Sequence, residues 1–397
     1  MRISTQIMYS QSSASLNRQQ AAYLNVGAQL ASGYRVNSAS DDPLAMSKAI
    51  GIGQSNAVND QFTAGRVSAR NSLGQEENIL NSVADGIAAI KTLLVQAQSS
   101  TLTDADRASI ASDINGIYET LIGQANSTDG NGRYLFGGYK DSSSPYTKDV
   151  AGNVTYVGDL NKSLVRIDSS RSVAASDTGV AIFGSVIGSA SMVATADPAN
   201  TGSVIVSSPT IEDTTNPNYR TGYSIEFSSV AGVTSYSVDG AAPLPYTSGD
   251  KVIVNGVGVT LTGVPAVGDK LTVAAGGNGD MFASIKSAVD ALNTSVSTGA
   301  TQAALTNALR TTMNNLSNNL DNVLTVRASV GTRLNELDTL DDIGENKTLN
   351  YKAATSDLLE LDYNAALSEY SFRKIGLEAA QKAFVDIQGL SLFKLLG

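Results

Sequence analysis

Proline placement separates the parts of this chain that can form long helices from a part that cannot. Six of the eight prolines lie in the middle of the sequence, at Pro198, Pro209, Pro217, Pro243, Pro245 and Pro265, and none follows Pro265. Proline removes a backbone donor and clashes with the preceding helical turn, so it interrupts helices and sheet ladders. The two flanks can therefore be helical over most of their length, whereas the middle must use shorter elements.

Apolar residues recur in both flanks with the seven-residue period of a coiled coil. One series is Leu73, Glu76, Leu80, Val83, Ile87, Ile90, Leu94 and Ala97. The other is Leu309, Met313, Leu316, Leu320, Val323, Arg327, Val330, Leu334 and Leu337. This spacing keeps one seam of a helix against its partner. A helix from Pro43 to about Ser99 would be about 85 Å long at 1.5 Å per residue. The pattern predicts a rod in which the chain runs out and back, with both termini at one end.

The first helix carries a weaker stripe, which Gly33 is expected to end as a C′ residue. The stripe is Ile3, Ile7, Ser10, Ala14, Asn17, Ala21, Leu24, Ala28 and Ala31, and the other faces carry apolar residues such as Leu16, Tyr23 and Leu30. A helix that is weakly apolar all round needs neighbours on several sides. We therefore predict an assembly interface on the terminal helices at Ile3, Ile7, Leu16, Tyr23, Leu24, Leu30, Leu361, Phe372, Ile375, Phe384, Ile387, Leu390, Leu392 and Phe393.

The terminal segments also have the composition of chains close to disorder. The first forty residues contain Arg2, Arg18 and Arg35 but no Asp or Glu, and many of the others are Ser, Gln and Asn. Such segments bury too little apolar surface to offset the entropy of folding. We expect both termini to be disordered in the monomer and to fold on assembly.

The middle of the chain has the residue types and alternation of strands. Val252-Ile-Val254 and Val257 flank Asn255-Gly256, which predicts a hairpin with a type I′ turn. A second hairpin is predicted around Gly152-Asn153, and its sheet is expected to continue through residues 164–167.

The predicted fold class is α+β and multidomain: a long α-helical coiled-coil rod built from both termini, with a central, mainly β inserted domain. Residues 1–40 and 360–397 are assigned to a terminal coiled-coil domain. Residues 41–172 and 277–359 are assigned to a helical rod domain with β-hairpins, and residues 173–276 to the inserted β domain.

Composition removes several classes of function. The chain has no Cys and no His, so thiolate nucleophiles, the commonest general base and the commonest metal ligands are missing. The net charge of −10 argues against nucleic-acid binding, which needs a basic face. No run approaches the roughly 20 apolar residues of a membrane helix, so membrane insertion is not expected. The start of the chain lacks the apolar core of a Sec signal, so export is expected to use another route.

Three local motifs have residue types found in binding sites, but each favours a structural interpretation. Asp41-Asp42 could bind a metal, but Asp42 followed by Pro43 is a strong helix start and no further ligands lie nearby. Asp129-Gly-Asn131-Gly132 lacks the remaining ligands of a calcium loop and is better explained as a turn. Gly256-Val-Gly258 lacks the third glycine of a dinucleotide loop. We predict no catalytic, cofactor or metal site.

Leu30-Ala-Ser-Gly33-Tyr-Arg35-Val-Asn37-Ser-Ala-Ser-Asp41-Asp42-Pro43 resembles the N-terminal signature of the flagellin family, and residues 379–396 resemble that family's other terminus. The signature residues carried over are Arg35, Asn37, Asp41, Asp42 and Pro43. The resemblance implies an inner coiled-coil tube domain made by paired terminal helices, a helical rod domain outside it, and a variable β domain that faces solvent.

Shorter motifs resemble the hook–filament junction branch of that family, the third hook-associated proteins. They are Asp41-Asp42-Pro43, Arg133-Tyr-Leu-Phe-Gly-Gly138 with Pro145-Tyr146 and Tyr156-Val-Gly-Asp159, Gly263-Val-Pro265-Ala-Val-Gly268-Asp269, and Leu390-Ser-Leu-Phe393. The resemblance implies a structural adaptor, not an enzyme, that joins the first hook-associated protein to flagellin in a ring of identical subunits. It also implies export by the flagellar type III apparatus with a cytoplasmic chaperone, and a final place in the extracellular flagellum. The alternatives are flagellin itself and a glycan-binding or adhesive insert.

Overall fold

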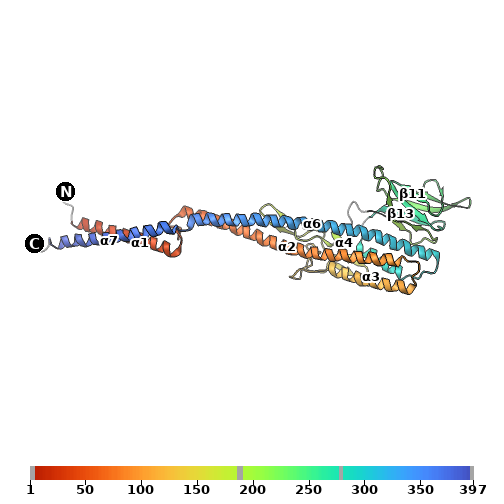
Figure 1. Cartoon of the computed structure of the whole chain (residues 1–397), viewed down its shortest axis with the longest axis horizontal. Coiled ribbons are helices and arrows are strands. Elements are labelled where there is room, and N and C mark those ends of the chain that lie inside the picture. Colours follow the sequence, from red (N-terminus) through yellow and green to blue (C-terminus); the bar gives the residue numbers. More distant parts are fainter. Residues whose placement is uncertain (1–4, 186–190, 277–279, 394–397) are drawn as a thin grey trace. The chain divides into compact units, whose positions relative to one another are not determined.

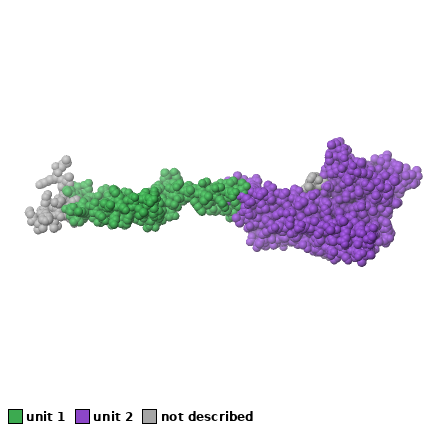
Figure 2. Space-filling model, in the orientation of Figure 1, with its two compact units in different colours: residues 1–64, 339–397 green, residues 65–338 purple. Residues whose placement is uncertain are grey.

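The structure is a computed structural model that describes residues 5–185, 191–276 and 280–393, with side chains of the terminal helices described from Ile7 and up to Asp386 (Figure 1). Seven helices are described: α1 Thr5–Ser32, α2 Pro43–Ala97, α3 Asp104–Ala125, α4 Gly179–Phe183, α5 Met281–Leu292, α6 Gly299–Leu359 and α7 Tyr363–Phe393. The chain divides into two compact units, residues 1–64 with 339–397 and residues 65–338 (Figure 2). We call these unit 1 and unit 2.

The helical part of unit 2 is organised around the predicted seams of α2 and α6. All eight α2 positions of the series from Leu73 to Ala97 are buried. In α6 every seventh residue is fully buried, at Leu309, Leu316, Val323, Val330 and Leu337. The two helices lie antiparallel, because Lys91 Nζ bonds Ser317 Oγ at 2.9 Å and Arg327 bonds Glu77 at 2.6 Å. The heptad prediction is confirmed for both helices.

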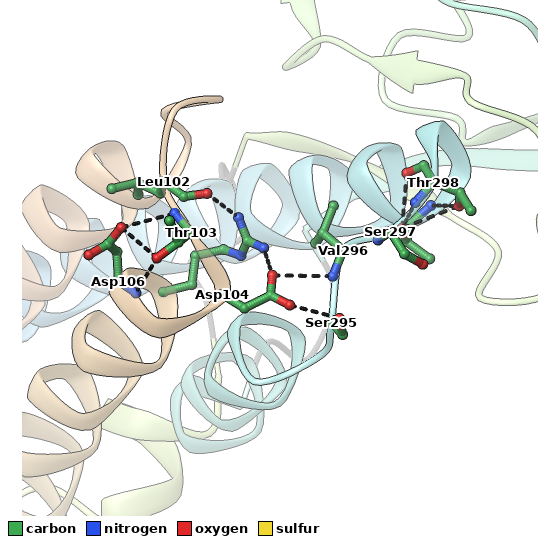
Figure 3. A network of polar contacts seen from close by, with 10 residues as sticks. Leu102, Thr103, Asp104, Asp106, Ser295, Val296, Ser297 and Thr298 are labelled. Atoms are coloured by element: carbon green, nitrogen blue, oxygen red, sulfur yellow. Dashed lines mark hydrogen bonds and ion pairs between the residues drawn. The ribbon is translucent and has the colours of Figure 1, made fainter.

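Helix α3 packs on α2 and is capped at its start by a capping box. A Cβ at Gly86 of α2 would lie 3.0 Å from the side chain of Leu121, so glycine lets α3 come close here. The Thr103 side chain accepts the backbone N–H of Asp106, and Asp106 accepts that of Thr103. Figure 3 shows Asp104 reaching the loop before α6, where its carboxylate accepts the Ser295 hydroxyl at 2.7 Å. These bonds fix the beginning of α3 to the segment between α5 and α6.

An aromatic cluster joins the first hairpin to α4 and α5. Strands β1 Tyr146–Lys148 and β2 Val154–Tyr156 pair antiparallel, as predicted around Gly152. The Tyr146 ring lies 5.1 Å from the Phe282 ring and 5.8 Å from the Phe183 ring, both measured between centroids. The predicted continuation of this sheet is wrong. Strands β3 Leu164–Arg166 and β4 Ser172–Ala174 pair with each other in a separate sheet.

The inserted β structure packs two sheets face to face. The five-stranded sheet has the order β10-β9-β8-β13-β5, formed by Leu244–Pro245, Val233–Val238, Tyr223–Val230, Lys270–Ala275 and Met192–Ala196. The second sheet joins β11 Lys251–Val254, β12 Val257–Thr262, β6 Ile205–Val206 and β7 Thr210–Ile211. Asn255 and Gly256 have φ of 50° and 75°, so the predicted Asn-Gly hairpin is confirmed. The core of the sandwich includes Ile225, Phe227, Val259, Leu261 and Val273.

Side chains of α6 hold the edges of this β structure and its approach. Asn307 accepts the Val206 N–H at 3.0 Å and donates to the Val204 carbonyl at 2.9 Å. Asn318 likewise accepts the Ser191 N–H at 2.8 Å and donates to the Ser191 carbonyl at 3.1 Å. An amide that donates and accepts at once satisfies a strand edge as a neighbouring strand would. At the edge formed by residues 204–206, the Asn307 side chain of α6 therefore makes the backbone hydrogen bonds that a neighbouring strand would make.

One helix of the described part passes a length-and-composition test for a membrane span. An 18-residue window of α2 has a mean hydropathy of 1.2, and 33% of that window is buried. Core helices pass the same test, so the signal is weak evidence. The expectation that the chain does not insert into a membrane stays a prediction.

Candidate assembly interface

In unit 1, α1 and α7 lie side by side and antiparallel (Figure 1). The rings of Tyr23 and Tyr370 stack with centroids 4.8 Å apart, and their hydroxyl oxygens are 2.5 Å apart. Tyr9 and Phe384 meet nearer the chain ends at 5.3 Å. The bond to the Tyr370 hydroxyl raises the pKa of Tyr23, which keeps this contact neutral. The described beginning and end of the chain thus meet at one end of unit 1, as the hairpin topology predicted.

The α1–α7 pair has almost no buried core of its own. No described side chain of α1 is buried, and Ala366 is the one buried residue described in α7. Leu16, Tyr23 and Leu30, seven residues apart, are half-buried and share the face that meets α7. Every described position of the weaker heptad stripe, from Ile7 to Ala31, is exposed. That stripe does not face α7 and is free on the outer side of the pair.

The predicted interface residues therefore divide between two faces. Large apolar side chains remain on the outer side: Ile7 is 55% exposed, Leu24 60%, Phe372 70% and Ile375 65%. Leu361 and Phe384 are half-buried within unit 1. Ile3 lies outside the described residues. Helix α7 includes Ile387, Leu390, Leu392 and Phe393, but their side chains lie outside the described ones.

The signature residues build the turn between α1 and α2. Gly33 has φ of 76° and its N–H bonds the Gln29 carbonyl, so the predicted helix stop is confirmed. Asp41 Oδ2 accepts the backbone N–H groups of Asn37 and Ser38 at 3.1 and 2.9 Å. Asp42 Oδ1 accepts the Ala45 N–H at 3.0 Å with Pro43 in the first helical position. In this geometry Asp42 caps the start of α2, as predicted.

The same turn is tied to the break between α6 and α7. The Arg35 N–H bonds the Leu359 carbonyl at 2.7 Å, and the Leu361 N–H bonds the Gly33 carbonyl at 3.0 Å. Tyr34 and Glu360 thereby form an antiparallel bridge. The Arg35 guanidinium adds a bond to the Leu358 carbonyl at 2.8 Å. The signature residues thus connect the turn between α1 and α2 to the turn between α6 and α7. The sequence alone does not reveal this contact.

A cavity of about 600 Å³ lies between α5, α6 and strand β5, with mostly Ala, Ser and Thr on its walls. No group of three or more His, Cys, Asp or Glu side chains within the described residues is placed to hold a metal ion.

Known proteins resemble this chain along its whole length. The profile of the bacterial flagellin N-terminal helical region matches residues 3–141. Over 396 residues the chain is 34% identical to flagellar hook-associated protein 3 of Escherichia coli (strain K12). The aligned region covers 100% of this chain and 99% of that protein. The chain belongs to the flagellar hook-associated protein 3 family.

Other members of the hook-associated protein 3 family agree with this assignment. Flagellar hook-associated protein 3 of Salmonella typhimurium (strain LT2) is 31% identical over 396 residues, with 100% of this chain and 99% of that protein covered. The crystal structure of Xanthomonas campestris FlgL is 30% identical, with a TM-score of 0.69 over 77% of this chain and 99% of that chain. The predicted family and the predicted α+β fold class are confirmed. As a hook-associated protein 3, the chain is a component of the bacterial flagellum.

Proposed function

We propose that this chain is the adaptor that joins the hook side of the flagellum to the flagellin filament. The observation that carries the proposal is the outer side of the α1–α7 pair, where Leu24 and Phe372 stay 60% and 70% exposed among the described residues of unit 1. Full-length similarity to flagellar hook-associated protein 3 favours this role over that of flagellin.

Physically, neighbouring subunits would complete the core that one chain lacks. Burial of apolar surface contributes about 25 cal/mol per Å² of favourable free energy. Association would therefore stabilise a helix pair whose apolar side chains are exposed in the single chain. Its terminal helices would then fold fully only on assembly, which couples folding to incorporation. The contacts at Tyr23–Tyr370 and Tyr9–Phe384 set the register of the two helices in the folded pair.

The partners follow from the same proposal. They are the first hook-associated protein on the hook side, flagellin on the distal side, and identical copies of this chain in a ring. The chain would be exported by the flagellar type III apparatus with the help of a cytoplasmic chaperone, and it would have no enzymatic activity. The absence of Cys fits a chain that must be threaded unfolded and needs no disulfides.

A deletion strain tests the function. Cells without this chain are expected to make hooks but no filaments and to release flagellin into the medium. Electron microscopy of the cells and immunoblots of the medium measure both effects. Normal filaments on the deletion strain would contradict the adaptor role. Purified chain that extends filament fragments without limit would instead identify it as a flagellin.

Leu24→Asp tests the outer face of α1. The carboxylate would have to be buried in the assembled core, so incorporation should be lost while unit 2 stays folded. Circular dichroism of the monomer and filament counts in the complemented deletion strain measure the two effects. Asn25→Asp is the matched control, because it adds the same charge at an exposed neighbouring position without removing an apolar side chain. Equal filament counts for the two variants would refute the assignment.

A further inference from the structure

Three pairs of asparagine followed by glycine lie in parts of the chain that the structure describes. They are Asn115-Gly116, Asn131-Gly132 and Asn255-Gly256, and a fourth pair at residues 278–279 lies outside the described residues. Asparagine is chemically labile, and a following glycine has no Cβ to keep its backbone nitrogen away from the side-chain amide carbon. The pairs share the same reacting atoms, so their structural surroundings decide which one reacts.

The helix α3 protects the first pair. Asn115 and Gly116 lie well inside Asp104–Ala125, where the Gly116 N–H bonds the carbonyl four residues before it. A bond in the middle of a helix opens only together with its neighbours. The Gly116 nitrogen is therefore held away from the Asn115 side chain.

Tight packing protects the pair in the β11–β12 hairpin. Asn255 Nδ2 donates to the Thr221 carbonyl at 3.2 Å. The Gly256 carbonyl accepts the N–H groups of Glu212 and Asp213 at 2.9 and 3.1 Å. Gly256 is buried, and a Cβ there would lie 2.0 Å from the Asp213 carbonyl oxygen. The turn cannot bring the Gly256 nitrogen onto the Asn255 side chain without breaking these contacts.

Asn131-Gly132 lies in an open loop instead. Residues 130–133 are all exposed, and a Cβ at Gly130 or Gly132 would meet no other atom within 4 Å. The Gly132 N–H bonds the Asp129 carbonyl at 3.0 Å across a turn. An exposed bond of this kind, outside a helix or sheet, opens at low free-energy cost. The loop can then bring the Gly132 nitrogen to the Asn131 amide carbon.

We propose that Asn131 is a site of spontaneous deamidation in the folded chain. The Gly132 nitrogen attacks Asn131 Cγ, the C–N bond of the side-chain amide breaks, and ammonia leaves with the Gly132 proton. This step gives a cyclic imide. Water then adds to either imide carbonyl and breaks the bond from that carbon to the ring nitrogen. The product is aspartate, or isoaspartate with a longer main chain.

Deamidation would change the loop that carries it. The Asp129 carboxylate accepts the N–H groups of Arg133 and Asn131 at 2.8 and 2.9 Å. Bonds from Arg133 and from Asn131 hold the pKa of Asp129 below its ordinary value, so Asp129 is charged at neutral pH. A new carboxylate at position 131 would repel it. We therefore expect the modified loop to be looser than the original.

Peptide mapping of the aged chain tests the proposal. The purified full-length chain is kept folded at neutral pH, and mass spectrometry follows the replacement of each amide by an acid. Asn131 should convert at least roughly tenfold faster than Asn115 and Asn255, because those two pairs must first open locally. Conversion at Asn115 or Asn255 as fast as at Asn131, or none at Asn131, would overturn the proposal.

Two controls separate the effect of the fold from that of the local sequence. In guanidinium chloride the three pairs lose their surroundings, so their rates should become similar. If the order seen in the folded chain persists there, the fold does not set it and the proposal is refuted. Asn131→Gln keeps an amide on a longer side chain that closes the ring poorly. This variant should lose conversion at position 131 and keep the wild-type rates at Asn115 and Asn255, and undiminished conversion at position 131 would contradict the imide route.

Discussion

At the scale of single residues, Glu76 is a carboxylate inside the apolar seam of α2. It is fully buried, and both its oxygens lie 3.2–3.3 Å from the Asp177 N–H. Burial raises the pKa of Glu76 to about 8, and the nearby Asp177 carboxylate adds to the shift. Burial alone would also raise the pKa of Asp177, but bonds from Lys162 and Arg333 hold it below its ordinary value. Glu76 is therefore protonated in the folded chain at neutral pH.

Glu76→Gln is predicted to remove a pH dependence of stability. Between pH 4.5 and 8 the folded chain keeps a proton that the unfolded chain releases, so the free energy of unfolding falls as pH rises through this window. Glutamine stays neutral and retains an acceptor for Asp177. From pH 5 to pH 9, the free energy of unfolding of the variant, measured in urea, should rise by on the order of 2 kcal/mol relative to that of wild type.

The neighbouring Glu77→Gln is the matched control for that experiment. Glu77 pairs with Arg327 near the surface and does not share the burial of Glu76. Its variant should follow the wild-type pH profile. If Glu76→Gln also runs parallel to wild type from pH 5 to pH 9, the buried proton is refuted.

Asp42→Ala should loosen the start of α2. The substitution removes the acceptor of the Ala45 N–H and should cost about 1 kcal/mol locally, whereas Asp42→Asn keeps a good cap. Hydrogen exchange at Ala45 and Met46 measures the effect. Unchanged protection in Asp42→Ala would mean that the tie between Arg35 and Leu359 is enough to hold the turn.

At the scale of elements, α6 serves two structures at once. One face supplies the buried seam from Leu309 to Leu337, and another supplies the amides that bind β-structure backbone. Asn322 binds helix α4 instead, by donating to the Ala181 and Ile182 carbonyls, both at 2.9 Å. The helix therefore fixes how the β structure of unit 2 is attached to its helical part.

Asn307→Ala is predicted to weaken that attachment. It leaves the Val206 N–H and the Val204 carbonyl unpaired in a buried place, which should cost about 2 kcal/mol. Urea unfolding followed by tyrosine fluorescence reports the loss. Asn314→Ala is the control, because the bond that the Asn314 side chain makes to Ser208 is exposed, so its loss should cost little. Equal losses in the two variants would show that burial of the amide does not matter.

At the scale of the whole molecule, the β structure and the terminal helices should differ in how far they are needed. Replacing residues 191–276 by a short flexible linker exposes Asn307 and Asn318 to water, which can satisfy them. Deleting residues 5–32 removes the partner of α7. Filament counts in the complemented deletion strain should be far higher for the first variant, and the reverse order would contradict the proposed interface.

The boundaries of that deletion come from contacts that the sequence pattern did not show. The inserted domain was predicted to begin at residue 173, and this division stays a prediction. However, Asp177 binds Arg333, and the Phe183 ring lies 5.6 Å from that of Phe136, so a deletion that began at residue 173 would open the helical part. A cut at residue 191 leaves these contacts intact.

By itself, the sequence determined the long helices, the seam positions and the two hairpins, because heptad spacing, prolines and Asn-Gly turns act over short stretches of chain. It also marked Asp42 as a cap and the terminal helices as poor in apolar residues. Only the tertiary structure decided which face of α1 meets α7 and that Arg35 connects the α1–α2 turn to the α6–α7 turn. It also decided that the Asp177 N–H bonds the Glu76 carboxylate. These contacts join residues hundreds of positions apart or on separate elements, and local spacing carries no information about which of several weakly apolar faces a distant partner will cover.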